Sequence, residues 1–140
     1  MRARDSALLF AYGTLMRGYP LHAVLTGRAT LLASGTVRGR LLDLGRYPGL
    51  VEGVGRVSGE VYRLDDPELL PVLDREEGYN FDRRRTTVTL AGGRRARAWL
   101  YRYRGPRARG TPISDGDYRR ARPPAARLAT SSSPWRSPWR

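Results

Sequence analysis

One stretch of the chain constrains its fold more than any other. Residues 86–103, TTVTLAGGRRARAWLYRY, alternate apolar and polar side chains on both sides of a paired glycine. Alternation with a period of two is typical of strands that bury one face, and Gly-Gly suits the tight turn between two antiparallel strands. The stretch therefore predicts a β-hairpin, and with it a sheet that is at least partly antiparallel.

Five further segments carry local signals, and among them strands outnumber helices. They are a short helix (20–27), two strands with a bend or bulge near Gly35 or Gly39 (29–45), a loop (45–53), a strand with one wet face (56–64) and a turn (111–118). Because the connections are short or hairpin-like, we predict an α+β fold: a small mixed, mostly antiparallel β-barrel with flanking helices.

A short apolar strand near the start ends in an unusual turn. Leu8–Tyr12 is short, continuous and apolar, which predicts a buried strand, and the turn Tyr12-Gly13-Thr14-Leu15 lies at its end. Gly13 allows backbone N–H groups to approach an anion closely, and the flanking hydroxyls of Tyr12 and Thr14 add donors. Such a turn suits a carboxylate or a developing oxyanion. The alternative is an ordinary strand end that only reverses the chain.

The clearest helix lies in DDPELLPVLDREEGY, residues 65–79. The aspartates before Pro67 can cap it, Pro67 suits its first position, and Gly78 suits its left-handed end. Pro71 is awkward inside such a helix, so a second interpretation begins the helix at Pro71 after an irregular turn.

Two acids at the end of this helix are candidates for proton transfer. On a helical wheel Glu76 and Glu77 both fall near the face formed by the leucines and Val72. A carboxylate beside apolar side chains loses hydration, which raises its pKa toward neutrality and suits it to act as acid and base. The wheel does not choose between them, and a frayed last turn with both acids in water is the alternative.

Composition excludes several classes of protein. The chain has 140 residues, which is the size of one domain, with no cysteine and one histidine, His22. Disulfides, a thiolate zinc site, a multi-histidine metal site and a Ser-His-Asp triad with its Gly-x-Ser-x-Gly turn are therefore not expected, and no cofactor is implied. No apolar run is long enough for a membrane span, and Ala7–Ala11 is too short for a signal peptide, so we expect a cytoplasmic protein.

The net charge of +13 is unevenly distributed. Residues 1–93 hold 13 Arg against 11 acids, whereas residues 94–140 hold 13 Arg against two. Residues 119–140 are rich in Arg, Pro and Ser, with almost no aliphatic side chains, which predicts a disordered tail after a domain spanning 1–118. Since every cation is Arg and the excess lies toward the end of the chain, we do not expect nucleic acid to be the partner.

Two segments together resemble one family. FAYGTLMRG, followed about 60 residues later by VLDREEGY, is similar to the γ-glutamylcyclotransferase-like (AIG2-like) family, whose members show Tyr-Gly-Ser/Thr-Leu after the first strand and Leu-Asp-x-x-Glu-Gly-Tyr at a helix end. LLDLGRYPGLVEG, VSGEVYRL and ISDGDY match as well. The resemblance covers roughly residues 7–118.

The resemblance implies an activity and a site. Family members cleave a γ-glutamyl amide by internal attack of the substrate's α-amine on its γ-carbonyl, a lyase- or acyltransferase-type reaction that releases 5-oxoproline and an amine without a cofactor. By the motif, Glu77 is the catalytic acid and base, and Tyr12, Gly13, Thr14 and Leu15 bind the glutamyl head group of a small-molecule substrate.

One departure from the pattern leaves alternatives open. Many members carry a Tyr within a Tyr-x-Arg pattern after the Glu-Gly-Tyr segment, whereas this chain has Phe81 in NFDRRR and lacks that hydroxyl. A non-catalytic member that binds a small molecule is therefore one alternative. An Arg-rich nucleic-acid-binding protein is the other, and its aromatic residues among the arginines would be Trp99, Tyr101, Tyr103, Trp135 and Trp139.

Overall fold

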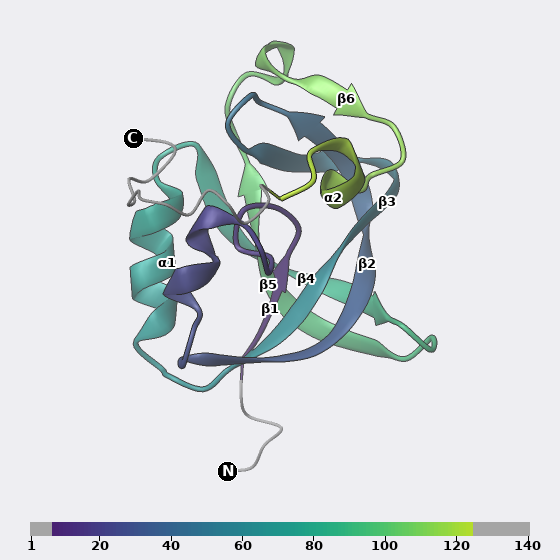
Figure 1. The fold of residues 1–140 in the computed structure, drawn as a ribbon. Coiled ribbons are helices and arrows are strands. Elements are labelled where there is room, and N and C mark those ends of the chain that lie inside the picture. Colours follow the sequence, from purple (N-terminus) through teal and green to yellow (C-terminus); the bar gives the residue numbers. More distant parts are fainter. Residues whose placement is uncertain (1–6, 125–140) are drawn as a thin grey trace.

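The computed structural model describes residues 7–124 (Figure 1). The elements are β1 (Leu8–Ala11), the 3₁₀ helix η2 (Pro20–Val24), β2 (Ala29–Asp43), β3 (Pro48–Leu64), α1 (Leu69–Glu77), β4 (Phe81–Leu90), β5 (Arg95–Tyr103), the 3₁₀ helix η3 (Arg107–Arg109), β6 (Thr111–Ile113) and α2 (Tyr118–Ala121). None of the helices within residues 7–124 is long and apolar enough to cross a membrane.

Five strands close into a barrel. β1 pairs with β3, β3 with β2, β2 with β4, and β4 with β5, all antiparallel, and β5 returns to β1 in parallel at Leu9 and Trp99. β6 pairs with the far end of β2, outside this ring. The predicted mixed, mostly antiparallel barrel is confirmed, and so is the hairpin, which is β4–β5.

The β2–β3 ribbon is longer and more regular than the sequence predicted. Residues 29–45 hold one strand instead of two, although the expected irregularity is present as a register shift between Arg38 and Arg40, around Gly39. The loop predicted over 45–53 is wrong from Pro48 onward, where β3 begins. Gly49 looked like a turn residue, but a Cβ there would lie 2.7 Å from that of Tyr103, so close packing accounts for it.

The turn predicted over 111–118 is partly a strand. Thr111–Ile113 forms β6, and the turn that follows ends at Gly116, whose φ is 68°. The Gly116 carbonyl accepts a hydrogen bond from the Ser58 N–H at 2.9 Å. This bond ties the segment to the middle of β3.

Helix α1 begins between its two predicted starts. It runs from Leu69 to Glu77, and an Asp66 carboxylate oxygen accepts from the Glu68 N–H at 2.9 Å. Pro71 is the third helical residue, where no intrahelical acceptor is available for an N–H. Gly78 has the expected positive φ, 79°.

The predicted start of the tail is too early. Arg119 belongs to α2, whose Asp117 side chain accepts from the Arg120 N–H, and Arg122 lies 2.9 Å from the Asp43 carboxylate. Residues 119–124 therefore continue the folded domain. The remainder of the predicted tail, residues 125–140, lies outside the described residues.

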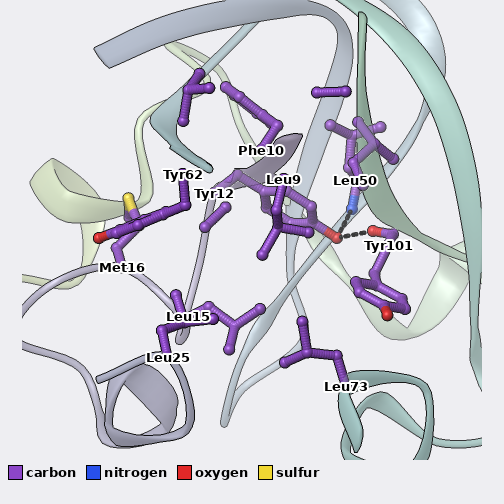
Figure 2. Close-up of a cluster of buried hydrophobic side chains, with 14 of the residues drawn as sticks. Leu9, Phe10, Tyr12, Leu15, Met16, Leu25, Leu50, Tyr62, Leu73 and Tyr101 are labelled. Carbon is purple, nitrogen blue, oxygen red and sulfur yellow. Dashed lines mark hydrogen bonds between the residues drawn. The ribbon is translucent and has the colours of Figure 1, made fainter. Parts of the chain in front are cut away.

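The barrel interior and the space under α1 form the core (Figure 2). Its fully buried side chains include Leu9, Phe10, Leu25, Leu41, Val57, Val61, Leu69, Leu73 and Val88. Leu69 and Leu73 lie one turn apart on α1, so they fix that helix against the barrel. The end of α1 is thereby placed next to the end of β1.

Candidate active site

A pocket lies where β1 ends and α1 ends. It is lined by Phe10, Ala11, Tyr12, Gly13, Thr14, Leu15, Tyr47, Pro48, Glu77, Phe81 and Tyr101. Its empty space is about 430 Å³, with the open mouth included. All four residues of the predicted turn line it together with Glu77, although more than 60 residues separate them in the chain.

The turn itself presents unused donors. Within residues 7–124, the backbone N–H groups of Gly13, Thr14 and Leu15 donate no hydrogen bond, whereas the carbonyls of Gly13 and Thr14 accept from Met16 and Leu21. Three consecutive unpaired N–H groups beside a pocket suit an anionic ligand group.

Gly13 is required for a reason that the sequence did not reveal. Its φ is not positive, so conformational freedom does not explain it. A Cβ at this position would lie 2.5 Å from Cγ of Pro48, which also lines the pocket. The glycine therefore allows the turn and Pro48 to pack directly against each other.

The Tyr12 hydroxyl is not available as a ligand donor, contrary to the interpretation of the turn. It donates to the Tyr101 carbonyl at 2.5 Å and accepts from the Leu50 N–H at 3.1 Å (Figure 2). Burial, together with the Glu77 carboxylate, raises its pKa above the usual range. Tyr12 thus joins β1, β3 and β5 and contributes its ring to the pocket wall.

Glu77 is the acid that faces the pocket. Burial, and secondarily the neighbouring Glu76 carboxylate, raises the pKa of Glu77 from 4.5 to about 8. Glu76 does not line the pocket. The structure therefore distinguishes the two acids, which the helical wheel left equivalent. Glu77, whose pKa is raised, lies in the pocket, and it is also the acid to which the family motif points.

Tyr101 connects the two halves of the pocket, a role that no motif in the sequence indicates. Its hydroxyl donates to Asp74 of α1 at 2.7 Å, while its carbonyl accepts from Tyr12. Asp74 is further held by the Arg83 guanidinium at 2.9 and 3.2 Å. Since Asp74 lies one helical turn before Glu77, these bonds fix the end of α1 relative to the binding turn.

Aromatic rings form the rest of the pocket. Phe81 packs between Tyr47 and Tyr103, with ring centroids 5.7 and 5.6 Å away. The position where family members carry a Tyr is thus part of the pocket wall, and here it is apolar. Tyr47 and Pro48 were not predicted to take part, because their segment was interpreted as a loop.

The site lacks the donor set of a metal centre. Among residues 7–124, no group of three or more His, Asp or Glu side chains is arranged to hold a metal ion. The groups available in the pocket are one carboxyl of raised pKa, three backbone N–H groups and an aromatic wall.

The fold and the site define a closed five-stranded barrel with a carboxyl at the end of a helix, facing a Tyr-Gly-Thr-Leu turn. Residues 9–120 match the family described as "Gamma-glutamyl cyclotransferase, AIG2-like". The chain belongs to this family.

Two bacterial relatives that this chain covers almost completely support the assignment. A Vibrio cholerae protein provisionally named as a γ-glutamylcyclotransferase is 38% identical over 113 residues, which cover 79% of this chain and 94% of that protein. The γ-glutamylcyclotransferase family protein YtfP of Escherichia coli is 34% identical, over 79% of this chain and 94% of its own.

Solved structures share the fold. The crystal structure of the uncharacterized Pyrococcus horikoshii protein PH0828 matches with a TM-score of 0.68 and 31% identity, over 84% of this chain and 93% of the other. The solution structure of E. coli YtfP matches with a TM-score of 0.58, over 79% and 95% of the two chains.

Proposed function

We propose that the protein is a γ-glutamyl cyclotransferase. Its substrate is a small molecule in which a γ-glutamyl group is joined to an amine by an amide bond. The products are 5-oxoproline and the free amine. The observation that carries the proposal is the single pocket that joins Glu77, with its raised pKa, to the unpaired N–H groups of Gly13, Thr14 and Leu15.

The reaction requires little beyond these groups. Glu77 takes a proton from the substrate's α-ammonium, and the resulting amine attacks the γ-carbonyl carbon of the same molecule. The C–N bond of the five-membered ring forms, and the carbonyl oxygen becomes an oxyanion. Glu77 then returns the proton to the departing nitrogen as the oxyanion re-forms the carbonyl and the amide C–N bond breaks. The ring nitrogen gives up its second proton to the released amine, which leaves as an ammonium ion. Because the attack is intramolecular, the enzyme mainly has to hold a folded conformer of the substrate.

The turn and the aromatic wall bind the substrate in two different ways. Backbone N–H groups of the turn hold an anionic group of the substrate or the oxyanion, which oriented donors stabilise in a site shielded from water. Tyr47, Phe81 and Tyr101 enclose the apolar part of the glutamyl chain. No step requires a metal or an organic cofactor.

The test is turnover of γ-glutamyl compounds by wild type and two variants. Glu77→Gln should lower kcat by about 10²–10⁴-fold while substrate binding is largely kept, whereas Glu76→Gln should have a much smaller effect. In wild type, kcat/KM should rise with pH through about 8, as Glu77 ionises. Equal losses in the two variants would show that the base has been assigned to the wrong residue. 5-Oxoproline formation in Glu77→Gln at close to the wild-type rate would refute the mechanism.

A non-catalytic member of the family is the first competing interpretation, and Phe81 is its main support. The matched experiment is Phe81→Tyr, which adds the hydroxyl that many relatives carry. If wild type binds 5-oxoproline without turning over any γ-glutamyl compound and Phe81→Tyr gains turnover, the protein is a binding member that has lost catalysis. If wild type is active, that interpretation fails.

A second candidate function, binding of a nucleic-acid backbone, is favoured by one separate surface. A broad hollow outside the barrel is lined by Arg38, Arg56 and Arg95 and by three threonines, with no acid among its lining residues. Within residues 7–124 none of these three guanidinium groups makes an ion pair or a hydrogen bond. Arg38 and Arg56 face each other directly across β2 and β3, where like charges repel and a phosphate between them would be favourable.

This surface is tested by titrating a fluorescent single-stranded oligonucleotide at several salt concentrations. The double variant Arg38→Ala/Arg56→Ala should reduce the salt slope by about two, one per lost phosphate contact. The control is Arg28→Ala. The Arg28 guanidinium pairs with Asp66 at 2.9 Å, and Arg28 does not line the hollow. Equal weakening per arginine removed would indicate an effect of net charge, and no binding at physiological salt would remove this candidate.

A further inference from the structure

One buried carboxylate holds the loop that forms the binding turn. Glu60 is 6% exposed and is the one charged side chain that is buried among the described residues. It lies on β3 directly opposite Ala11, the last residue of β1. Its side chain accepts a hydrogen bond from the Arg17 N–H at 3.0 Å. A single residue therefore adjoins both the start and the end of the segment 12–16.

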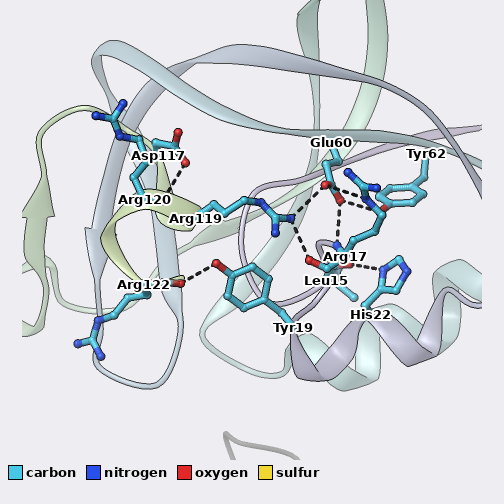
Figure 3. A network of polar contacts seen from close by, with 10 residues as sticks. All are labelled: Leu15, Arg17, Tyr19, His22, Glu60, Tyr62, Asp117, Arg119, Arg120 and Arg122. Atoms are coloured by element: carbon cyan, nitrogen blue, oxygen red, sulfur yellow. Dashed lines mark hydrogen bonds and ion pairs between the residues drawn. The ribbon is translucent and has the colours of Figure 1, made fainter. Parts of the chain in front are cut away.

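Both oxygens of this carboxylate are fully engaged (Figure 3). Oε1 accepts from the Tyr62 hydroxyl at 2.7 Å as well as from Arg17 N–H. Oε2 accepts from the Arg119 guanidinium at 3.1 Å and from Arg17 Nε at 3.4 Å. Burial favours the neutral acid, but these hydrogen bonds and the two guanidinium charges outweigh it and lower the pKa of Glu60 below its usual value. Glu60 thus remains a carboxylate and has no free oxygen for chemistry.

The C-terminal helix closes the network from the other side. The Arg119 guanidinium that reaches Glu60 also donates to the Arg17 carbonyl at 2.9 Å. The Tyr19 hydroxyl donates to the Arg122 carbonyl at 2.6 Å, and the Tyr19 and Tyr118 rings lie 5.4 Å apart. Helix α2 is therefore bonded to the loop at Arg17 and again at Tyr19.

The loop needs these bonds because it has little structure of its own. Residues 12–19 belong to no helix or strand. Inside the loop, Met16 N–H bonds to the Gly13 carbonyl and Tyr19 N–H to the Met16 carbonyl. His22 from η2 donates through Nδ1 to the Leu15 carbonyl at 3.0 Å. The unpaired N–H groups of the turn are thus oriented mainly by contacts with neighbouring elements.

We propose that Glu60 and Arg119 are positioning residues, which clamp the loop after β1 between β3 and α2 and so hold the N–H groups of Gly13, Thr14 and Leu15 in a ligand-binding conformation. Neither residue lines the pocket, so they act through the loop. The consequence for catalysis rests on the proposed function, while the clamp itself does not. The segment 119–122, which composition assigned to a disordered tail, therefore helps to order the binding loop through the contacts of Arg119 and Arg122.

The experiment combines a structural readout with a kinetic one. The variants are Glu60→Gln and Arg119→Ala, with Arg119→Lys as the conservative partner that keeps a charged donor. The control is Arg120→Ala, from the same helix, whose guanidinium pairs with the exposed Asp115 at 3.5 Å. Amide hydrogen exchange over residues 12–19 measures the order of the loop without reference to activity. KM and kcat are then measured with a γ-glutamyl substrate.

Arg119→Ala should speed exchange over residues 12–19 by about tenfold and raise KM by about tenfold, with the pH dependence of kcat unchanged because Glu77 is untouched. Glu60→Gln should have the larger effect, Arg119→Lys should restore most of both values, and Arg120→Ala should resemble wild type. Unchanged exchange in Arg119→Ala, or faster exchange with an unchanged KM, would overturn the proposal. If wild type neither turns over nor binds γ-glutamyl compounds, the proposed function fails, and the exchange data still decide whether the clamp exists.

Discussion

Replacing Glu77 by glutamine should stabilise the protein at neutral and alkaline pH while it greatly lowers activity. The pocket holds the Glu77 carboxyl at a pKa of about 8, against 4.5 for the ordinary side chain. The folded state therefore disfavours the charged form more than the unfolded state does. Glutamine has nearly the same shape and no charge to bury, so it removes this penalty.

The sign and the size follow from linkage. Below pH 4.5 the side chain is neutral in both states and costs nothing. As the pH rises from 4.5 through 8 the unfolded chain ionises first, and stability is lost until the folded protein ionises too. The difference between the two pKa values corresponds to about 5 kcal/mol at about 1.36 kcal/mol per pH unit. Because Glu77 keeps some exposure in an open pocket, we expect the gain to be about 1–3 kcal/mol.

Thermal unfolding at two pH values measures this gain. The Tm difference between Glu77→Gln and wild type should be near zero at pH 4 and roughly 4–10 °C at pH 8.5. Any steric effect of the substitution is present at both pH values, so the change between them isolates the ionisation. Glu76→Gln is the matched control, and it should show a smaller effect, arising from relief of its repulsion with Glu77. A Tm difference that is the same at both pH values would refute the reasoning.

Three further predictions concern the surroundings of the site. Gly13→Ala should destabilise the fold by about 1–3 kcal/mol and impair turnover, because its Cβ would overlap Pro48; denaturant unfolding and kinetics check both. Tyr101→Phe loses the hydrogen bond to Asp74 and should cost about 1 kcal/mol of stability. It should also lower kcat/KM more than this loss of stability explains, and a variant as stable and as active as wild type would contradict a positioning role. A chain that ends after residue 124 should keep the Tm and activity of the full protein. Residues 125–140 contain too few apolar side chains to offset the entropy of ordering, and a Tm lower by several degrees would show that they pack on the barrel.

Much of the barrel could be predicted because its signals are local. The β4–β5 hairpin follows from alternation around Gly92-Gly93, and α1 from its prolines and its terminal glycine. The long β2–β3 ribbon could not be read in the same way. Gly49 and Gly53 resemble turn residues in the sequence, but Gly49 is required by the Tyr103 side chain that packs on it. Close packing between strands leaves no local signal.

In the candidate site too, some residues could be predicted from local motifs and others could not. Glu77 and the turn at Tyr12–Leu15 carry motif signals, and the fold brings them to one pocket. The groups that orient them, Tyr101 and Glu60, carry none, because their partners are set by strand register and by α2 docking. Tyr101 holds the end of α1 through its side chain and the end of β1 through its carbonyl, an arrangement that only the closure of β5 against β1 creates.

Helix α2 shows why composition misplaced the end of the domain. Residues 119–124 are charged or small, so they bury little apolar surface, and an argument from hydrophobicity assigns them to a disordered tail. They are held instead by specific partners: the Arg119 guanidinium by the buried Glu60 carboxylate, and Arg122 by Asp43 and the Tyr19 hydroxyl. A charged segment becomes ordered when the fold offers it a buried charge that it can help to neutralise, and Arg119 adds a second guanidinium to the Arg17 that already pairs with Glu60. Leaving a buried carboxylate short of partners is costly. In this protein that carboxylate lies beneath the binding loop, so the same contact that completes the domain also orders the site.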